Sequence, residues 1–303
     1  MPLIYLLSLY LLLMSSFPAA PAKDALPVPP GGIRLQENLY LDETEVSNIH
    51  WWEYMHHLQK DSSLAQYKAA MPDTTVWDKV DVTGHMKKNY FRSPGYRFFP
   101  VVGVSYEQML NYCRWRSAAA TAAFNSNPKN KKKYKLQGQE VVFRYRLPTE
   151  AEWKMAAEQS RNTRLLTRKL ATAPAAYSII DSLGNSRPDK QKALEKYLSQ
   201  HADTALNCLK KFEPGLYYGL LEPEKTYPNP QRKAVVLYGR YPHLIGNVAE
   251  MTQQKGIAKG GSWAHRLEQV SVEKVNSYEA PTAWLGARCI GEVYLVPQAK
   301  AQQ

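Results

Sequence analysis

The stretch between residues 244 and 265, LIGNVAEMTQQKGIAKGGSWAH, constrains the fold more than any other part of this chain. It joins glycine-rich turns to a lone carboxylate, Glu250, and carries little charge for a solvated loop. The glycine pair Gly260-Gly261 allows close backbone approach, and the ring of Trp263 can fill the space beside it. We therefore expect an interior position, as an active site, an ion site, or a core without chemistry.

The N-terminus has the pattern of a secretory signal. Residues 3–17 are apolar over about the length of a signal core and are too short to span a membrane well. Ala20-Pro21-Ala22 offers a cleavage site, which predicts a signal peptide at 1–22, a linker at 23–32 and export to the periplasm or cell envelope. An uncleaved anchor is the alternative. Because no lipid-accepting cysteine follows the signal, membrane association stays open.

The charge balance is strongly basic, with a net charge of +12, and the hydrophobic content of 44% can build a sizeable core. Nucleic acid is not the expected partner of an exported chain, which leaves an acidic partner, an anionic membrane surface or acidic glycans as alternatives. Much of the excess lies in the run at 129–135, KNKKKYK, which favours a solvated loop.

Two helix starts are well marked. Ser105 and Gln108 form one capping-box pattern, and Thr149 and Glu152 form the second. An aromatic helix is expected over 49–58, with its apolar residues at 49, 52, 55 and 58.

Alternating or apolar segments predict strands, at 33–35, 39–41, 234–238, 256–259 and 283–290. Residues 61–99 are expected to be loop with short elements, and the stretches at 117–143 and 159–232 have the composition of insertions. Few strands, two capped helices and much loop indicate one α+β domain over 33–293, followed by a flexible tail at 294–303.

An ordered set of motifs resembles the formylglycine-generating enzyme, or sulfatase-modifying factor, domain. In order these are ETEVSN (43–48), PVVGVSYEQMLNYCRW (100–115), RLPTEAEWKMAA (146–157), GNVAEM (246–251), KGGSW (259–263) and LGARC (285–289). The resemblance implies a variant of the C-type-lectin-like fold, with little regular secondary structure and long insertions.

The resemblance also organises the cysteines. Three cysteines in an oxidising compartment leave one pair and one unpaired thiol. The family's disulfide matches Cys113 and Cys289, so the resemblance predicts that bridge and leaves Cys208 unpaired.

The family's oxidase reaction depends on two thiolates that bind copper. His265 and Val270 occupy the matching places here, and valine offers no ligand. The resemblance therefore predicts no catalytic residues. An enzyme of altered mechanism, with a metal held by His265, is the alternative.

Calcium is the one cofactor that the resemblance keeps open. Its ligands would be Gly246, Val248 and Glu250, with His243 in a fourth place where relatives have an oxygen ligand. Alternatively, Glu250 is a buried carboxylate bound by backbone N–H groups and Arg288. We interpret the remaining motif residues as structural core, namely Trp153, Gly260, Gly261, Ser262, Trp263 and Arg288.

These observations favour a non-catalytic, exported protein that acts as a structural or interaction component of the cell envelope with a protein partner. It is similar in this respect to gliding-motility and type IX secretion components of the family. A metal-dependent enzyme and a glycan- or peptide-binding module are the alternatives; the module rests on fold analogy alone.

Overall fold

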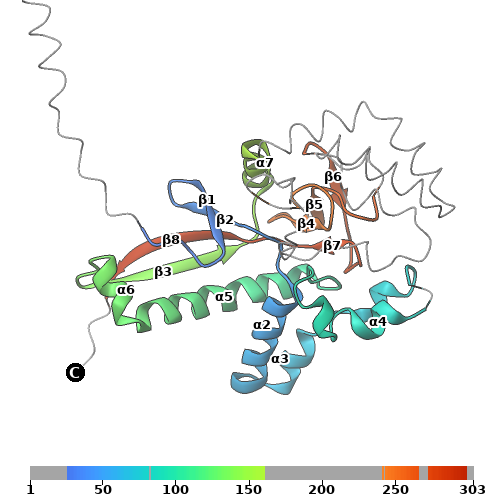
Figure 1. Cartoon of the computed structure of the whole chain (residues 1–303), viewed down its shortest axis with the longest axis horizontal. Coiled ribbons are helices and arrows are strands. Elements are labelled where there is room, and N and C mark those ends of the chain that lie inside the picture. Colours follow the sequence, from blue (N-terminus) through green and yellow to red (C-terminus); the bar gives the residue numbers. More distant parts are fainter. Residues whose placement is uncertain (1–25, 82, 161–240, 242, 266–271, 299–303) are drawn as a thin grey trace, which may run out of the picture.

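The computed structural model describes residues 26–81, 83–160, 241, 243–265 and 272–298 (Figure 1). Within them, two four-stranded sheets lie end to end; most helices lie below the sheets in this view, and the helix over residues 150–159 lies above them (Figure 1). The mixture of helices and short strands is that of an α+β domain.

The first sheet is antiparallel throughout, with strand order β1-β2-β8-β3. Its strands are β1 (Gly32–Gln36), β2 (Leu39–Asp42), β8 (Ile290–Pro297) and β3 (Gln139–Arg146). The predicted strands at 33–35 and 39–41 are therefore confirmed. β3 pairs with β8 along the full length of both strands, so β3 forms one edge of the sheet.

The second sheet is small and has the order β6-β5-β4-β7. Its strands are β4 (Ala249–Met251), β5 (Ile257–Lys259), β6 (Val275–Ser277) and β7 (Leu285–Gly286). β4 and β7 are parallel, and the other pairs are antiparallel. The predicted strand at 256–259 is confirmed, the one at 283–290 is divided between β7 and the start of β8, and 234–238 lies outside the described residues.

Six α-helices lie in the described part of the chain, with two short 3-10 helices, η1 (Thr74–Trp77) and η2 (Pro94–Tyr96). The α-helices are α2 (Asn48–Asp61), α3 (Leu64–Ala69), α4 (His85–Asn89), α5 (Tyr106–Ser126), α6 (Pro128–Lys133) and α7 (Glu150–Gln159). Residues 61–99 do consist of loop with short elements, as expected. Both predicted capping boxes are present, at the first turns of α5 and α7.

The buried face of α2 differs from the predicted one. Trp51, Tyr54, Met55 and Leu58 are buried, whereas Trp52 is 38% exposed. The indole N–H of Trp51 donates to the carbonyl of Ala70 at 2.9 Å, which turns this ring into the core. The helix at 49–58 was predicted correctly, but the face predicted to be buried is displaced by about one residue from the face that is buried in the structure.

Both predicted boundaries of the domain move outward. The carbonyl of Pro30, in the expected linker, accepts hydrogen bonds from Arg116 and Tyr145, so the chain is already fixed there. At the other end, residues 294–297 belong to β8 and pair with β3. Residues 299–303 and 161–240, which hold most of the second expected insertion, lie outside the described residues.

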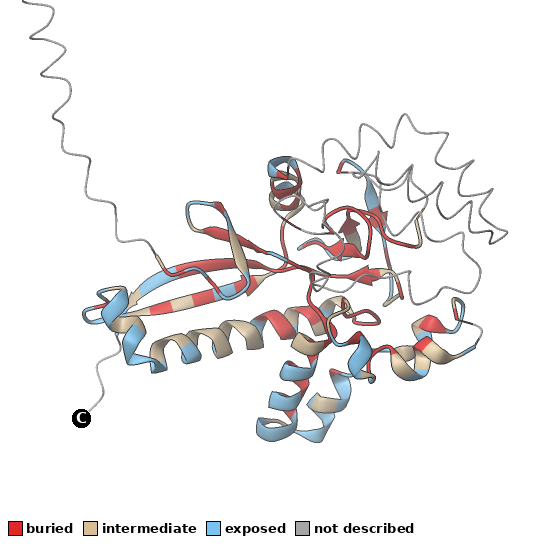
Figure 2. Cartoon of the chain, in the orientation of Figure 1, coloured by how far each residue is buried: buried red, intermediate tan, exposed pale blue. Residues whose placement is uncertain are grey.

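The stretch at 117–143 is an integral part of the packed domain, which corrects the view of it as a separate insertion. α5 continues to Ser126, the lysine run lies mostly in α6 and is not a loop, and β3 returns along α5 (Figure 1). Val141 and Phe143 of β3 are buried in the main core (Figure 2). α5, β3 and the end of β8 form an arm, with α6 at its tip (Figure 1).

Side chains of α5 satisfy the open edge of β3. Ser117, Thr121 and Asn125 accept hydrogen bonds from the backbone N–H groups of residues 145, 143 and 141, at 2.8, 3.0 and 3.1 Å. Four residues of helix rise about 6 Å, close to the about 6.7 Å of two strand residues, so the two ladders stay in step. The edge is thereby closed to pairing with another chain.

We expect Thr121→Val to weaken this edge. The variant keeps the side-chain shape but leaves the Phe143 N–H without its acceptor, which costs about 1–3 kcal/mol of unfolding free energy. Urea denaturation measures the loss. Thr121→Ser, which keeps the hydroxyl, is the matched control, and an equal loss in both variants would contradict the hydrogen-bond account.

Candidate functional site

The glycine-rich stretch forms the centre of the second sheet and the turns that flank it. Gly260 and Gly261 follow β5 directly, and both have left-handed backbone conformations, with φ of 89° and 68°. A Cβ on Gly260 would lie 2.4 Å from the carbonyl oxygen of Leu244 and 3.1 Å from Trp153. A side chain is excluded at this position, because both the conformation and the close approach require glycine.

A buried ion pair lies beside this glycine corner. Arg288 and Glu250 are both fully buried, and the Nε and Nη2 atoms of Arg288 each lie 2.9 Å from Oε1 of Glu250. The other carboxylate oxygen, Oε2, accepts the indole N–H of Trp153 at 2.7 Å. Arg288 also donates through Nη1 to the carbonyls of Asp42 and Glu43, at 3.1 and 2.6 Å. Every part of the pair is hydrogen-bonded.

A second carboxylate, Glu45, shares the same cation and was not singled out from the sequence. It is 2% exposed, and its Oε2 accepts the side-chain N–H of Asn247 at 2.8 Å. Burial raises the pKa of Glu45 well above its ordinary value, against the attraction of Arg288. Burial also raises the pKa of Glu250, against the opposing effect of the hydrogen bonds that Arg288 and Trp153 donate to its carboxylate. The signal in the sequence that could have identified Glu45 was an acidic residue directly before the apolar Val46 in the motif ETEVSN.

The end of the stretch forms a closed turn. The Ser262 hydroxyl lies 2.6 Å from Nδ1 of His265 and accepts the backbone N–H of Ala264 at 3.1 Å. Ser262 is fully buried, so its hydroxyl cannot meet a substrate in this conformation. The His265 ring stands edge-on to Trp284, and the Trp263 indole donates to the carbonyl of Ala283 at 3.0 Å.

Cys113 and Cys289 face each other in the main core. Their sulfur atoms lie 3.6 Å apart, and both residues are buried as free thiols. The hydrogen bond from the neighbouring thiol and burial together raise the pKa of Cys289 well above its ordinary value. The two residues lie in the positions that the predicted bridge needs. The bridge itself stays a prediction, and Cys208 lies outside the described residues.

Comparison with known proteins places this chain in a family. The family model for the sulfatase-modifying factor enzyme 1-like domain matches residues 14–293. The chain belongs to this family. No curated protein matches it. Among solved structures, Treponema denticola variable protein 1 is similar at 17% identity, with 83% of this chain and 84% of that chain covered and a TM-score of 0.37.

Membership confirms the predicted fold class, an α+β fold of the sulfatase-modifying factor type. It leaves catalysis open, because the family includes catalytic and non-catalytic members. Within the described residues, no helix is long and apolar enough to cross a membrane.

The residues matching the family's calcium site do not fit a calcium ion here. Both oxygens of Glu250 are already hydrogen-bonded, and one of them lies against the guanidinium of Arg288, which would repel a second cation. His243, 8% exposed and left-handed in backbone conformation, brings an imidazole where calcium prefers oxygen. With Gly246 and Val248 nearby, the geometry favours the ion-pair interpretation of Glu250.

The family's oxidase positions fit copper no better. His265 lies beside Ser262 and Trp284, and Val270 lies outside the described residues. Within the described residues, no three His, Cys, Asp or Glu side chains are grouped as metal ligands. The residues interpreted as core do pack as core: Trp153, Trp263 and Arg288 are all buried.

We expect Arg288→Met to be among the most damaging substitutions. It leaves a buried carboxylate and two backbone carbonyls without their donor, and breaking such a pair typically costs about 3–5 kcal/mol. Lys255→Met breaks an exposed pair with Glu107 and should cost under about 1 kcal/mol. Urea denaturation compares the two, and similar losses would contradict the assigned role of Arg288.

We expect Glu45→Gln to remove part of the pH dependence of stability. A raised carboxyl pKa means that the folded state holds its proton to higher pH than the unfolded state does. Wild-type stability therefore falls as the pH rises above the ordinary value of 4.5 toward the folded-state pKa. The melting temperature of the variant should rise relative to that of the wild type as the pH increases from 5 to 8. A constant difference over that range would show that Glu45 is not protonated.

Proposed function

We propose that this chain is an exported, non-catalytic member of the sulfatase-modifying factor family that serves as a structural or interaction component of the cell envelope. The observation that carries the proposal is the residue set at the oxidase position. His265 and Val270 stand where the reaction needs two thiolates, and Cys113 and Cys289 are buried against each other elsewhere.

The alternative of a metal enzyme built on His265 has weaker support. Nδ1 of this histidine lies 2.6 Å from the buried hydroxyl of Ser262, and the ring lies against Trp284. These contacts give the imidazole a structural role in closing the turn. Among the residues that the structure describes, no group of three His, Cys, Asp or Glu side chains includes this imidazole, and a catalytic metal ordinarily has three protein ligands.

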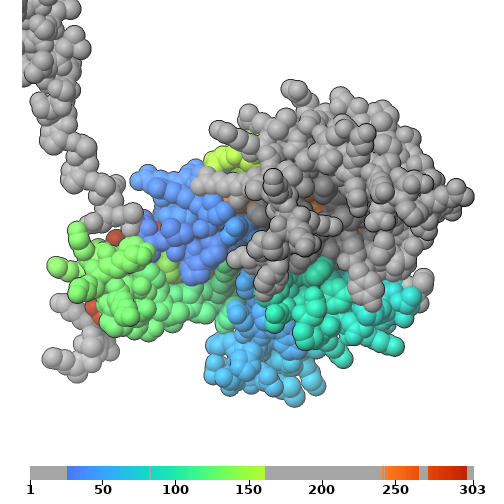
Figure 3. All heavy atoms as spheres, viewed as in Figure 1, coloured from blue at the N-terminus to red at the C-terminus, as the bar shows by residue number. Residues whose placement is uncertain are grey.

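The arm supports an interaction role. Its tip carries the exposed side chains of Lys129, Lys132 and Lys133. The light-green end of the arm is uncovered in Figure 3, and Figure 1 shows α6 at the end of the first sheet that lies away from the second sheet. α6 begins at a proline capped by Asn127, and the ring of Tyr134 packs against Phe124, so the tip is a fixed structure. A rigid basic surface of this kind attracts an acidic partner over about a Debye length.

The proposed partner is therefore an acidic protein of the envelope, in machinery such as that for secretion or gliding. Reversing the tip charge should remove this partner while leaving the fold intact, because all three lysines are exposed. Glutamate is favourable at position 129 in the first turn of α6, and at 132 and 133 in the last turn it costs about 0.3–1 kcal/mol each. Deleting the tip would be a poorer test, because Phe124, Tyr134 and Leu136 pack in the core that it closes.

We expect the triple variant of Lys129, Lys132 and Lys133 to Glu to lose envelope proteins that co-purify with the wild type. The matched control carries the same charge change at exposed lysines on other helices, Lys60, Lys68 and Lys88, and should keep them. Loss in both variants would indicate a general charge effect and contradict a specific role for the tip.

Two further outcomes bear on the proposal. Binding of the wild type to anionic vesicles, lost in the tip variant, would replace the protein partner by a membrane surface. Formation of an aldehyde on a cysteine-containing peptide, with copper and oxygen present, would overturn the non-catalytic assignment.

A further inference from the structure

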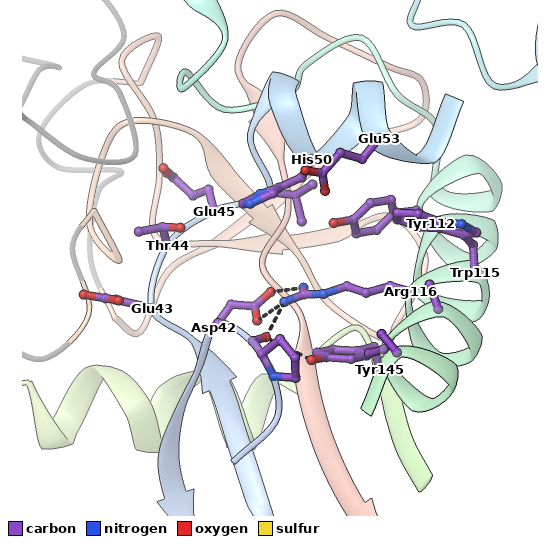
Figure 4. A pocket seen from close by; sticks show the side chains of 16 residues that line it. Asp42, Glu43, Thr44, Glu45, His50, Glu53, Tyr112, Trp115, Arg116 and Tyr145 are labelled. Atoms are coloured by element: carbon purple, nitrogen blue, oxygen red, sulfur yellow. Dashed lines mark hydrogen bonds and ion pairs between the residues drawn. The ribbon is translucent and has the colours of Figure 1, made fainter. Parts of the chain in front are cut away.

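A cavity of about 510 Å³ lies between α2, α5 and the chain that follows β2 (Figure 4). One wall is the face of α5 that carries Tyr112, Trp115 and Arg116, followed by a run of alanines. The opposite wall is the backbone and side chains of residues 42–46, and His50 and Glu53 of α2 close the top of the view in Figure 4. The cavity is separate from the turn that holds Ser262 and His265.

Tyr112 is the unusual residue of this cavity. It is 2% exposed, its hydroxyl points into the cavity, and that hydroxyl has no hydrogen-bond partner among the described residues (Figure 4). Burial raises its pKa well above the ordinary value, so the phenol stays protonated and can both donate and accept. The neighbouring Tyr145, by contrast, donates to the carbonyl of Pro30 at 2.9 Å. The hydroxyl oxygen is open to the cavity and is not one of the fully buried polar atoms without a partner, so water or the polar group of a ligand can reach it and pair with it.

The charge of the lining selects the kind of molecule. Arg116 is the one Lys or Arg side chain of the lining, and Asp42 pairs with both of its terminal nitrogens, so this pair is neutral. Glu45 accepts a hydrogen bond from Asn247, and burial raises its pKa and so disfavours its charged form. Of the other two carboxylates, Glu43 and Glu53, both exposed, Glu53 points toward the Tyr112 hydroxyl (Figure 4). The cavity is thus acidic at this end in a chain whose net charge is +12.

We propose that this cavity binds an alkylammonium group, carried either by a free diamine or by a lysine side chain of a partner protein. The ammonium lies between the Glu53 carboxylate and the Tyr112 hydroxyl, and the ring of Trp115 adds a favourable cation–π contact. The methylene stem packs on the small side chains of α5, Ala119, Ala120 and Ala123. An anion is disfavoured by Glu53 and Glu43. This inference does not depend on the absence of catalysis.

Calorimetric titration of the mature chain at low salt tests the assignment, with n-butylamine, 1,5-diaminopentane and N-acetyl-lysine amide as probes. We expect the amines to bind and the uncharged n-butanol and the anion butyrate not to bind. Tighter binding of N-acetyl-lysine amide than of the diamine identifies a protein lysine as the source of the group, and the reverse order identifies a free amine.

Glu53→Gln should weaken amine binding at least tenfold. Glu37→Gln makes the same charge change at an exposed residue of the β1–β2 turn, and should leave binding within twofold of wild type. Equal weakening in the two variants would overturn the site, because it would reduce binding to the general charge of the chain. Failure of the wild type to bind any amine, or equally tight binding of n-butanol, would also overturn it.

Tyr112→Phe separates the hydroxyl from the fold. Because the hydroxyl has no partner in the described protein, the variant should melt at the temperature of the wild type or above it when no amine is present. It should nevertheless bind amines several-fold more weakly. A lowered melting temperature without amine would show that the hydroxyl has a structural partner and would overturn its assignment to the ligand.

Discussion

The guanidinium of Arg288 joins the second sheet to the end of the first sheet through side-chain hydrogen bonds. It contacts Glu250 of the second sheet and the carbonyls of Asp42 and Glu43 at the end of the first, while Trp153 of α7 holds the same carboxylate. A hydrophobic side chain cannot replace these contacts, because the carbonyls would remain buried and unpaired. The buried cation thus fixes the relative position of the two sheets together with the backbone hydrogen bonds from Asp42 to Cys289 and from Val46 to Ala287.

This arrangement also bears on the calcium site that the resemblance to the family implies. The carboxylate oxygens of Glu250 are bonded to Arg288 and Trp153. Glu45 brings a second acid close to the same cation, and burial raises the pKa of that acid. The polar atoms of the ion pair are thus matched within the described residues, which makes Glu250 a poor ligand for an added cation.

Local signals in the sequence predicted the parts of the fold that depend on local physics. The capping boxes at Ser105 and Thr149 need only residues three apart, and the glycine corner at Gly260 needs only a steric exclusion. The arm was not predicted because it depends on contacts between residues that are far apart in the sequence. Ser117, Thr121 and Asn125 recur every fourth residue in an alanine-rich helix, a pattern that acquires meaning only beside the edge of β3.

The candidate site shows the same division. Motifs pointed to Glu250, Arg288 and Trp263, and the structure does bring Glu250 and Arg288 into contact, but as satisfied core groups. The Tyr112 cavity was not predicted, since its walls come from α2, α5 and the chain after β2, and no periodicity links them. In the sequence, the acidic residue of the cavity, Glu53, cannot be distinguished from an ordinary charged residue on the surface of a helix.

The region around Arg288 and the Tyr112 cavity differ in whether their polar atoms are hydrogen-bonded within the protein. Around Arg288 the polar atoms of the ion pair are matched inside the protein, which makes that region a framework. In the cavity, the Tyr112 hydroxyl has no hydrogen-bond partner among the described residues. It lies on α5, which hydrogen bonds to β3 hold in place. Because α5 cannot shift to bury that hydroxyl without breaking those bonds, the cavity is preformed, and a ligand entering it does not have to reorganise the wall. A rigid wall with one unmatched polar group is a better reason to expect binding than a matched cluster at an inherited motif.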